Sequence, residues 1–303
     1  MKKVSVLIPV YNVQSFIEEA VNSILENSYR NIEIIIINDA SNDGTFEILD
    51  RIKTKESRVK VITNQTNIGI SKSLNKGLAA SLGDYILRMD GDDISHKDRI
   101  VRKVNFLENN PDISIVGCST LSIDTSGNII GMRHFTSNQN VIRKTKYLAS
   151  PLSHIWLCKA EVYKKLNGYR DLDGVEDYDF LLRALRNNFK ISNLEEYFGY
   201  FVRLGREGNS ISLHGSHKIE LFNYAVKLDK EYYSKGKDSF PAGIPTKRID
   251  KVFDYGMKYR NNALVKKGQK KVINSMIYIL LCLFNRNLRL DLARMLQYKM
   301  LTK

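Results

Sequence analysis

Apolar stretches of strand length alternate with amphipathic stretches of helix length through the first 120 residues, and no other feature limits the possible folds as strongly. Strands are expected at residues 4–10, 33–37, 59–63, 84–89 and 113–117, and helices at 14–27, 45–55, 71–82 and 96–109. Strands that alternate with helices of this length build a mostly parallel sheet with helices on both faces. The sequence therefore predicts an α/β protein.

Four of the expected strands end in polar or acidic residues. These ends carry Pro9-Val10-Tyr11-Asn12, Asn38-Asp39-Ala40-Ser41, residues 64–69 and Asp90 to Asp93. Open α/β sheets bind their ligands at the carboxyl ends of the strands, so the four loops are predicted to share one site. The first loop lacks G-x-G-x-x-G, which argues against an NAD or FAD fingerprint, and the absence of G-x-x-x-x-G-K-[ST] excludes a P-loop.

The loop after the fourth strand carries three carboxylates, Asp90, Asp92 and Asp93. Ionised groups beside a buried strand end are costly unless a cation or hydrogen bonds offset their charge. In extended chain, residues i and i+2 point the same way, so Asp90 and Asp92 are predicted to face one site. Two oxygen ligands of this kind suit Mg²⁺ or Mn²⁺. A solvated acidic turn is the alternative that these residues alone leave open.

The second half is less regular, and we expect it to complete the same domain. Helices are expected at 141–148, 161–166 and 218–235 and after an acidic cluster at 171–179, strands at 155–158 and 191–202, and a polar connection at 131–140. A stretch rich in Gly and Pro at 236–246 reads as a linker. The predicted plan is a catalytic domain at 1–235, divided near residue 120, then the linker and a helical region at 247–303.

Basic residues are concentrated in that last region. Residues 247–303 hold 14 Lys/Arg and 3 Asp/Glu, a net charge of +11, whereas the preceding 246 residues hold 33 and 30, a net charge of +3. A strongly basic segment indicates an anionic partner, and nucleic acid and anionic lipid are the two candidates. The sequence carries no nucleic-acid recognition motif, so no nucleic-acid partner is predicted.

Cys118, Cys158 and Cys282 lie far apart in the sequence. They match neither a disulfide framework nor a metal motif, which predicts a reducing, cytoplasmic compartment. The N-terminal residues run directly into the first strand and do not read as a signal peptide.

Taken together, these motifs resemble family 2 glycosyltransferases of the GT-A fold, in particular bacterial enzymes that build surface polysaccharides. The resemblance covers roughly residues 3–212. It rests on Ser5 to Asn12, Asn38 to Gly44, Asn67 to Gly69, Asn75 to Gly77, Arg88 to Ile94, Pro151 to His154, Gly168-Tyr169 and Glu176 to Asp179. The implied fold is a Rossmann-like, mostly parallel sheet with flanking helices, here followed by a basic helical tail.

The resemblance implies a nucleoside-diphosphate sugar, most often a UDP-sugar, lying across the strand ends. The residues expected to contact this donor are Pro9, Tyr11, Asp39, Asn67, Lys72, Asp90 and Gly91. The first three would hold the base, and Gly91 would leave room for the ribose or diphosphate. Many relatives carry an Arg where this chain has Leu74, so Lys72 is a weak substitute for that basic contact.

The family's Asp-x-Asp motif maps onto Asp90-Gly91-Asp92, which makes Asp90 and Asp92 the expected ligands of Mn²⁺ or Mg²⁺. The ion would neutralise charge on the leaving nucleoside diphosphate. A carboxylate must also accept the proton of the acceptor hydroxyl. The resemblance assigns this role to Asp177, with Glu176 beside it, and implies inversion at the anomeric carbon. Without the resemblance, both acids read as favourable charges at a helix N-terminus.

His154, Arg203 and Arg206 occupy positions that the resemblance connects with the acceptor or the diphosphate. A structural role is the alternative for the histidine, and a solvated loop is the alternative for the arginines.

Two stretches of the tail bear on membrane association. The apolar run 272–284 is too short to span a bilayer, and 287–300 is a basic amphipathic stretch of the kind that lies in a membrane interface. A peripheral enzyme on the cytoplasmic membrane face, acting on a lipid-linked glycan, is therefore expected. The alternative is a helical hairpin docked on the catalytic domain or on a second subunit of a homo-oligomer.

A nucleotidyltransferase on a similar sheet is the alternative function. It would release pyrophosphate instead of a nucleoside diphosphate, and the Glu176-Asp177 pair would have no clear role in it.

Overall fold

The computed structural model describes residues 1–205, 215–246, 251–265 and 269–301. The chain divides into two compact units. One holds residues 1–139 and 151–204, and the other holds residues 140–150 and 205–303.

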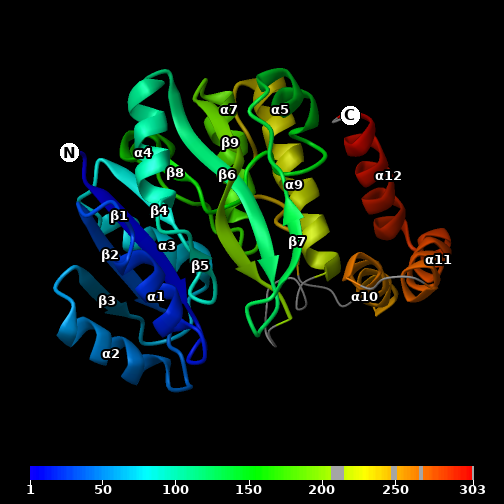
Figure 1. Cartoon of the computed structure of the whole chain (residues 1–303). Helices are drawn as coiled ribbons and strands as arrows, with labels where there is room; N and C mark the ends of the chain where they lie inside the picture. Colours follow the sequence, from blue (N-terminus) through cyan, green and yellow to red (C-terminus); the bar gives the residue numbers. More distant parts are fainter. Residues whose placement is uncertain (206–214, 247–250, 266–268, 302–303) are drawn as a thin grey trace. The chain divides into compact units, whose positions relative to one another are not determined.

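The first unit opens with the predicted alternation of strands and helices (Figure 1). Its elements are β1 (Val4–Val10), α1 (Ile17–Leu25), β2 (Ile32–Asn38), α2 (Thr45–Lys55), β3 (Val59–Thr63), α3 (Ile70–Ala79), β4 (Tyr85–Arg88), β5 (Ile94–Ser95) and α4 (Arg99–Asn109). The neighbours β3, β2, β1 and β4 pair in parallel, as the sequence predicts. Their carboxyl ends therefore lie at one edge of the sheet.

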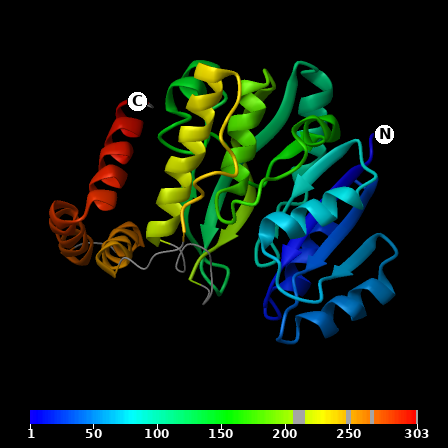
Figure 2. The same cartoon turned by 180° about the vertical axis from the view of Figure 1, so that it is seen from behind.

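Helices cover both faces of this parallel part. Val6 and Ile8 of β1 belong to the same core as Ile17 of α1. Leu7 points to the opposite face, because successive side chains of a strand alternate. There α3 packs so closely that a Cβ on Gly77 would lie 2.7 Å from Ile37 Cδ1. Figure 2 shows α3 on the face opposite to α1.

The rest of the first unit makes the sheet mixed. Its elements are β6 (Ile113–Ile123), β7 (Ile129–Arg133), β8 (Leu157–Lys159), α6 (Ala160–Leu166), α7 (Glu176–Arg186) and β9 (Lys190–Arg203). The strand order is β3-β2-β1-β4-β8-β6-β9-β5, with β7 on β6. β8 runs antiparallel to both β4 and β6, whereas β6 and β9 pair in parallel. The sheet is therefore parallel among its first four strands and mixed beyond them.

Two short strands were not expected. The polar connection predicted at 131–140 is wrong in its first residues, because β7 forms a hairpin with β6 in which Met132 lies opposite Leu121. The two-residue β5 pairs with β9. β7 is a strand because it pairs with the neighbouring β6, and β5 because it pairs with β9, which lies far away in the sequence. Their own residues do not indicate either strand.

The second unit is helical. It contains α5 (Gln139–Thr145), α9 (Gly215–Lys235), α10 (Lys251–Val265), α11 (Gln269–Phe284) and α12 (Arg286–Leu301). Phe253, Tyr278, Cys282 and Leu288 form the core of its last three helices. Compactness places α9 with this unit, whereas the sequence places the boundary after α9, at 236–246. That boundary stays a prediction. Among the helices of the described ranges, none has the length and hydrophobicity that a membrane crossing requires.

Candidate active site

An antiparallel strand brings a histidine to the acidic loop that follows β4. Leu87 of β4 lies opposite Leu157 of β8. Continuing the same register beyond both strands sets Asp90 opposite His154. The side chains do meet there, with His154 Nε2 2.7 Å from Asp90 Oδ2.

Asp93 completes a group of possible metal ligands. Ligand atoms of Asp90, Asp93 and His154 all lie within 4.8 Å of one another. Two carboxylates and an imidazole suit Mn²⁺, while Mg²⁺ favours oxygen ligands alone. The donor set therefore fits a divalent cation, and it includes the histidine that the sequence connected with the acceptor.

The structure groups Asp93, and not Asp92, with Asp90. Asp90 and Asp92 would face one site only if the chain stayed extended beyond Asp90, but β4 ends at Arg88. The backbone then turns, with Asp93 N 3.5 Å from Asp90 O. A turn brings residues three apart to the same side, so the i, i+2 geometry does not apply. Metal binding by Asp92 stays a prediction.

The acidic loop is crowded with negative charge. Asp93 is 3% exposed, and burial, together with the charges of Asp90 and Asp92, raises the pKa of Asp93 well above its usual value. Two hydrogen bonds oppose this rise: Arg203 N donates to Asp93 Oδ1 at 2.7 Å, and the side chain of Tyr200 also forms a hydrogen bond with Asp93. A bound cation would offset the remainder.

The guanidinium of Arg203 is buried and forms its hydrogen bonds with other groups of the protein. It is 3% exposed, and its Nε donates to the Asp92 carbonyl at 2.9 Å. Nη1 donates to the carbonyls of Asp124 and Thr125, at 3.3 and 3.2 Å, and Nη2 to Glu19 at 2.7 Å. Arg203 thus fixes the acidic loop, and this geometry does not favour the predicted contact with acceptor or diphosphate. Arg206 lies outside the described residues.

A buried ion pair ties α7 to β4. Arg88 Nη1 donates to Glu176 Oε1 at 2.9 Å, and both side chains are buried. Burial raises the pKa of Glu176, and the neighbouring Arg88 opposes that rise. Gly174 N also donates to Glu176, at 2.8 Å. Glu176, the predicted neighbour of the catalytic base, is therefore a buried residue that anchors α7 to β4.

Asp177 stands next to this anchor, in the first turn of α7. Unlike Glu176, it is partly exposed. Arg88, the partner of Glu176, lies two residues before Asp90. The ion pair thus connects the helix turn that carries Asp177 to the strand that leads into the acidic loop.

Asp39 joins the loops after β2 and β3. It is buried, and its Oδ1 accepts hydrogen bonds from Asn64 Nδ2 at 2.8 Å and Ile68 N at 2.9 Å. Oδ2 accepts one from Gly69 N at 2.9 Å. An ionised carboxylate has about four acceptor positions, so these three bonds leave capacity on Oδ2. The predicted contact with the base stays a prediction.

Other residues expected at the donor are spread along the same edge. Tyr11 is 44% exposed and Pro9 partly so. Asn67 accepts a hydrogen bond from Gly69 N at 3.3 Å. Lys72 pairs on the surface with Asp171, at 3.0 Å, and that hydrogen bond raises the pKa of Lys72. These contacts are compatible with a donor site.

Gly91 packs against the end of β1. A Cβ there would lie 2.5 Å from Val10 Cγ1. Close packing against Val10 is thus a second reason for glycine at this position, besides room for a ligand.

The acidic cluster at 171–179 acts mainly on neighbouring elements. Asp173 Oδ1 accepts from Ser71 N at 2.9 Å, which caps the N-terminus of α3. Asp179 binds Arg183 Nε at 2.7 Å. The sequence shows the cluster, but the partners of Asp173 and Glu176 come from α3 and β4, which lie far away along the chain.

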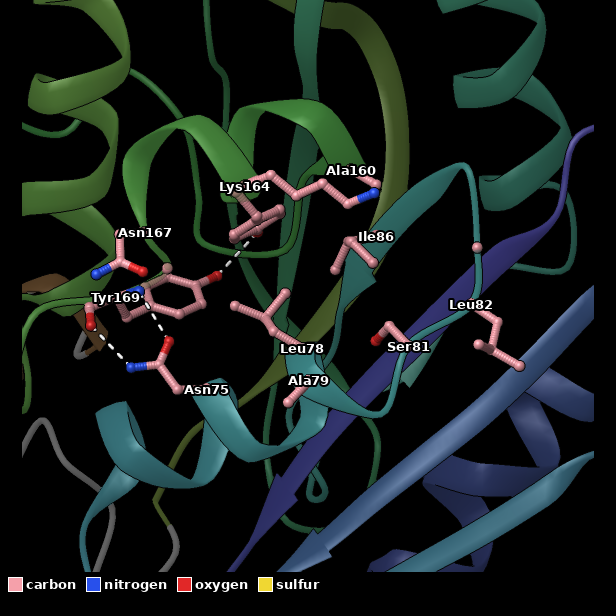
Figure 3. Close-up of a pocket in the computed structure, with 13 residues that line it drawn as sticks. Asn75, Leu78, Ala79, Ser81, Leu82, Ile86, Ala160, Lys164, Asn167 and Tyr169 are labelled. Carbon is pink, nitrogen blue, oxygen red and sulfur yellow. Dashed lines mark hydrogen bonds between the residues drawn. The ribbon is translucent and has the colours of Figure 1, made fainter.

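A separate cavity of about 750 Å³ lies between α3 and α6 (Figure 3). Asn75 closes one side of it with two hydrogen bonds to the backbone of Tyr169, at 2.8 and 2.9 Å. The cavity includes Gly83, which precedes β4, whereas the carboxylates follow β4. It is therefore at the opposite end of this strand from the metal group.

The fold agrees with what the comparisons with known proteins find. The profile described as "Glycosyl transferase family 2" matches residues 5–166. EpsE of Bacillus subtilis, which is named as a glycosyltransferase, is 37% identical over 201 residues, covering 64% of this chain and 70% of EpsE. An uncharacterized glycosyltransferase of Haemophilus influenzae is 31% identical over 260 residues, covering 82% of this chain and 78% of that protein.

Solved structures with the same fold are much more distant in sequence. TarS of S. aureus in complex with UDP-GlcNAc has a TM-score of 0.59 and 18% identity, covering 99% of this chain and 90% of TarS. The mannosyltransferase PcManGT of Pyrobaculum calidifontis, in complex with GDP-Man and Mn²⁺, has a TM-score of 0.60 and 16% identity, covering 99% and 85%.

The chain is thus a glycosyltransferase of the GT-A fold, and it belongs to glycosyl transferase family 2. This confirms the family that the sequence motifs indicated.

Proposed function

We propose that this protein transfers a sugar from a UDP-sugar to a glycan acceptor, with inversion at the anomeric carbon and dependence on a divalent cation. The observation that carries the proposal is the convergence of Asp90, Asp93 and His154 at the carboxyl end of β4 in a family 2 chain. PcManGT, which shares the fold, is described in complex with a nucleotide sugar and Mn²⁺.

The donor would lie across the ends of β1, β2 and β4. Exposed Tyr11 and the remaining capacity of the Asp39 carboxylate support a base site at the first two. TarS, which shares the fold, is described in complex with UDP, and this favours uracil as the base.

Asp90, Asp93 and His154 would hold Mn²⁺ or Mg²⁺, which, when bound, neutralises negative charge on the leaving diphosphate. Asp177 would accept the proton of the acceptor hydroxyl while that oxygen attacks the anomeric carbon and the bond to the diphosphate breaks. A single displacement of this kind inverts the anomeric centre. Arg88 and Glu176 would position Asp177 for the step.

We place the acceptor, a lipid-linked glycan, at a membrane surface in the synthesis of a cell-surface polysaccharide. The +11 net charge of residues 247–303 supports this part of the proposal. An anionic leaflet attracts such a segment.

The test uses the full-length protein, Mn²⁺, UDP- and GDP-sugars, and a lipid extract of bacterial membranes as the source of acceptor. We expect consumption of a UDP-sugar, release of UDP, and loss of both on addition of EDTA. From an α-linked donor, NMR of the product should show a β linkage. Release of pyrophosphate would instead identify a nucleotidyltransferase and overturn the proposal.

The role of Asp177 has its own test. Asp177→Asn should lower the rate of transfer about 10²- to 10⁴-fold and leave the affinity for UDP nearly unchanged. If Asp177→Asn transfers sugar at the normal rate, the base is another group.

A further inference from the structure

The helix α11 exposes a continuous apolar face. Its exposed large apolar residues are Val272, Ile273, Met276, Ile279, Leu280, Leu283 and Phe284, each between 53% and 77% exposed. At 100° per residue, they fall within an arc of about 140°. Scattered apolar residues are ordinary on protein surfaces, but a stripe of this length calls for an explanation.

This stripe is not part of the core of the second unit. The core of that unit takes a different side of α11, where Tyr278 and Cys282 pack with Phe253 and Leu288. α11 (orange-red in Figure 1) therefore has two apolar sides, one buried and one exposed.

Cations flank the stripe at both ends. Residues 272–284 contain no charged side chain, while Lys270 and Lys271 precede them and Arg286 and Arg289 follow. The nearest acid in sequence, Asp291, already binds Arg260 at 2.6 Å and the Tyr278 hydroxyl at 2.8 Å. An apolar face with basic ends complements an anionic membrane, whose headgroups attract cations while its acyl boundary accepts apolar side chains.

A second copy of the chain fits this face less well. A helix face of this length measures roughly 20 by 10 Å, or about 200 Å² in projection, against about 800 Å² per partner in a stable interface. Two copies joined through the stripe would also bring their basic ends together. Like charges would then oppose the contact.

We propose that α11 docks this protein on an anionic membrane, lying flat with residues 272–284 at the boundary between headgroups and acyl chains. The inference rests on the proposed function only in giving the docking a purpose, which is access to a lipid-linked acceptor. It differs from the expectation that 287–300 is the interfacial helix. In α12, Leu288 is fully buried and Leu292 packs against the same core.

Flotation of full-length protein with vesicles tests this docking without donor or acceptor. The vesicles are phosphatidylcholine alone or phosphatidylcholine with phosphatidylglycerol. Ile279→Gln/Leu283→Gln removes apolar surface with a good helix former, and Lys270→Gln/Lys271→Gln removes charge. Leu82→Gln makes the same kind of change at an apolar residue, 77% exposed, in the first unit.

We expect wild type and Leu82→Gln to float with anionic vesicles and not with phosphatidylcholine alone. Ile279→Gln/Leu283→Gln should bind them about 10-fold or more weakly. Lys270→Gln/Lys271→Gln should bind more weakly and lose part of the salt dependence.

Three results would overturn the proposal: no flotation of wild type, equal flotation of the stripe variant, or a wild-type dimer in light scattering that the stripe variant converts to monomer. The last would assign the stripe to a second copy. Asp177→Asn should float normally, so a failure of sugar transfer and a failure of docking can be told apart.

Discussion

At the scale of single residues, the site depends on side chains that differ sharply in exposure although they are adjacent. Glu176 is 2% exposed and paired with Arg88, while Asp177 is partly exposed. Replacing Glu176 should therefore mainly lower stability, whereas replacing Asp177 should mainly lower activity.

Glu176→Ala should destabilise the protein by about 3–5 kcal/mol, because it removes the hydrogen-bonded counter-charge of the buried Arg88 and leaves only the more distant Asp90, at 3.8 Å. Asp177→Ala should change stability by only about 0.5 kcal/mol while sugar transfer is lost. Urea denaturation of both variants measures the difference. Equal destabilisation by the two changes would show that the ion pair does not anchor α7.

His154→Ala and Asp93→Asn should each weaken Mn²⁺ binding about 10-fold or more, since ligands matter at least as much as the groups that orient them. Titration calorimetry with Mn²⁺ measures the affinity. Asp50→Asn, at an exposed position on α2, removes the same charge away from the site and should bind Mn²⁺ normally. Unchanged binding in His154→Ala would exclude the histidine as a ligand.

The buried Lys103 should make the free energy of unfolding depend on pH. It is fully buried, its Nζ donates to Ile155 O at 2.8 Å, and burial lowers the pKa of Lys103 to about 8 from 10.5. Below pH 8 both folded and unfolded states carry the proton. Between pH 8 and 10.5 the unfolded chain binds more of it, so this group makes the free energy of unfolding rise with pH.

The difference in stability between wild type and Lys103→Met should therefore shift by about 1–2 kcal/mol in favour of wild type from pH 8 to 9.5. Subtracting the variant's stability from that of wild type cancels the pH dependence of the other titratable groups, which both proteins share. One of these groups is Cys158. Burial raises its pKa, so its contribution to the pH dependence has the opposite sign. Denaturation curves of both proteins at pH 8 and 9.5 measure this difference. A difference that does not vary with pH would mean that Lys103 titrates normally.

At the scale of elements, the start of α3 is held by a residue from the loop before α7. Gly69 has φ of +89°, and a Cβ there would lie 2.0 Å from Asp173 Oδ2. Both the backbone conformation and the cap from Asp173 therefore require glycine.

Gly69→Ala should cost more stability than Gly127→Ala. Gly127 has φ of +87°, but a Cβ at this residue would meet nothing within 4 Å, so its alanine variant should lose only about 1–2 kcal/mol from backbone strain. The excess in Gly69→Ala should shrink when Asp173→Ala is added, as thermal or urea unfolding of the double variant would reveal. Equal losses at the two glycines would argue against the Asp173 contact.

Elements with a strong periodicity of their own were predictable from the sequence. β1, α2 and β3 have the predicted bounds, because local apolar spacing sets them. β5 and β7 were missed because pairing with β9 and β6 defines them. Of the possible metal ligands that the structure brings together, Asp90 could be named from its loop, but Asp93 depends on the turn after β4 and His154 on the antiparallel register of β8. Metal binding itself stays a prediction.

At the scale of the whole molecule, ligand binding should stabilise the fold by mass action. Mn²⁺ with UDP, each at about 100 times its dissociation constant, should add about 2.7 kcal/mol or more to the free energy of unfolding. Thermal unfolding with and without EDTA measures this. Stabilisation by UDP that is indifferent to EDTA would separate nucleotide binding from the metal.

The place of β8 in the sheet has a consequence for how the protein folds. β8 lies between β4 and β6, yet both neighbours precede it in the chain. The two earlier strands must leave a gap until a strand more than 30 residues downstream of β6 closes it, and such long-range pairings are slow to form. His154 arrives with that closing strand. Asp90, Asp93 and His154 can therefore come together only after β8 has been inserted, so a nascent chain that has not yet inserted β8 lacks this group of possible metal ligands.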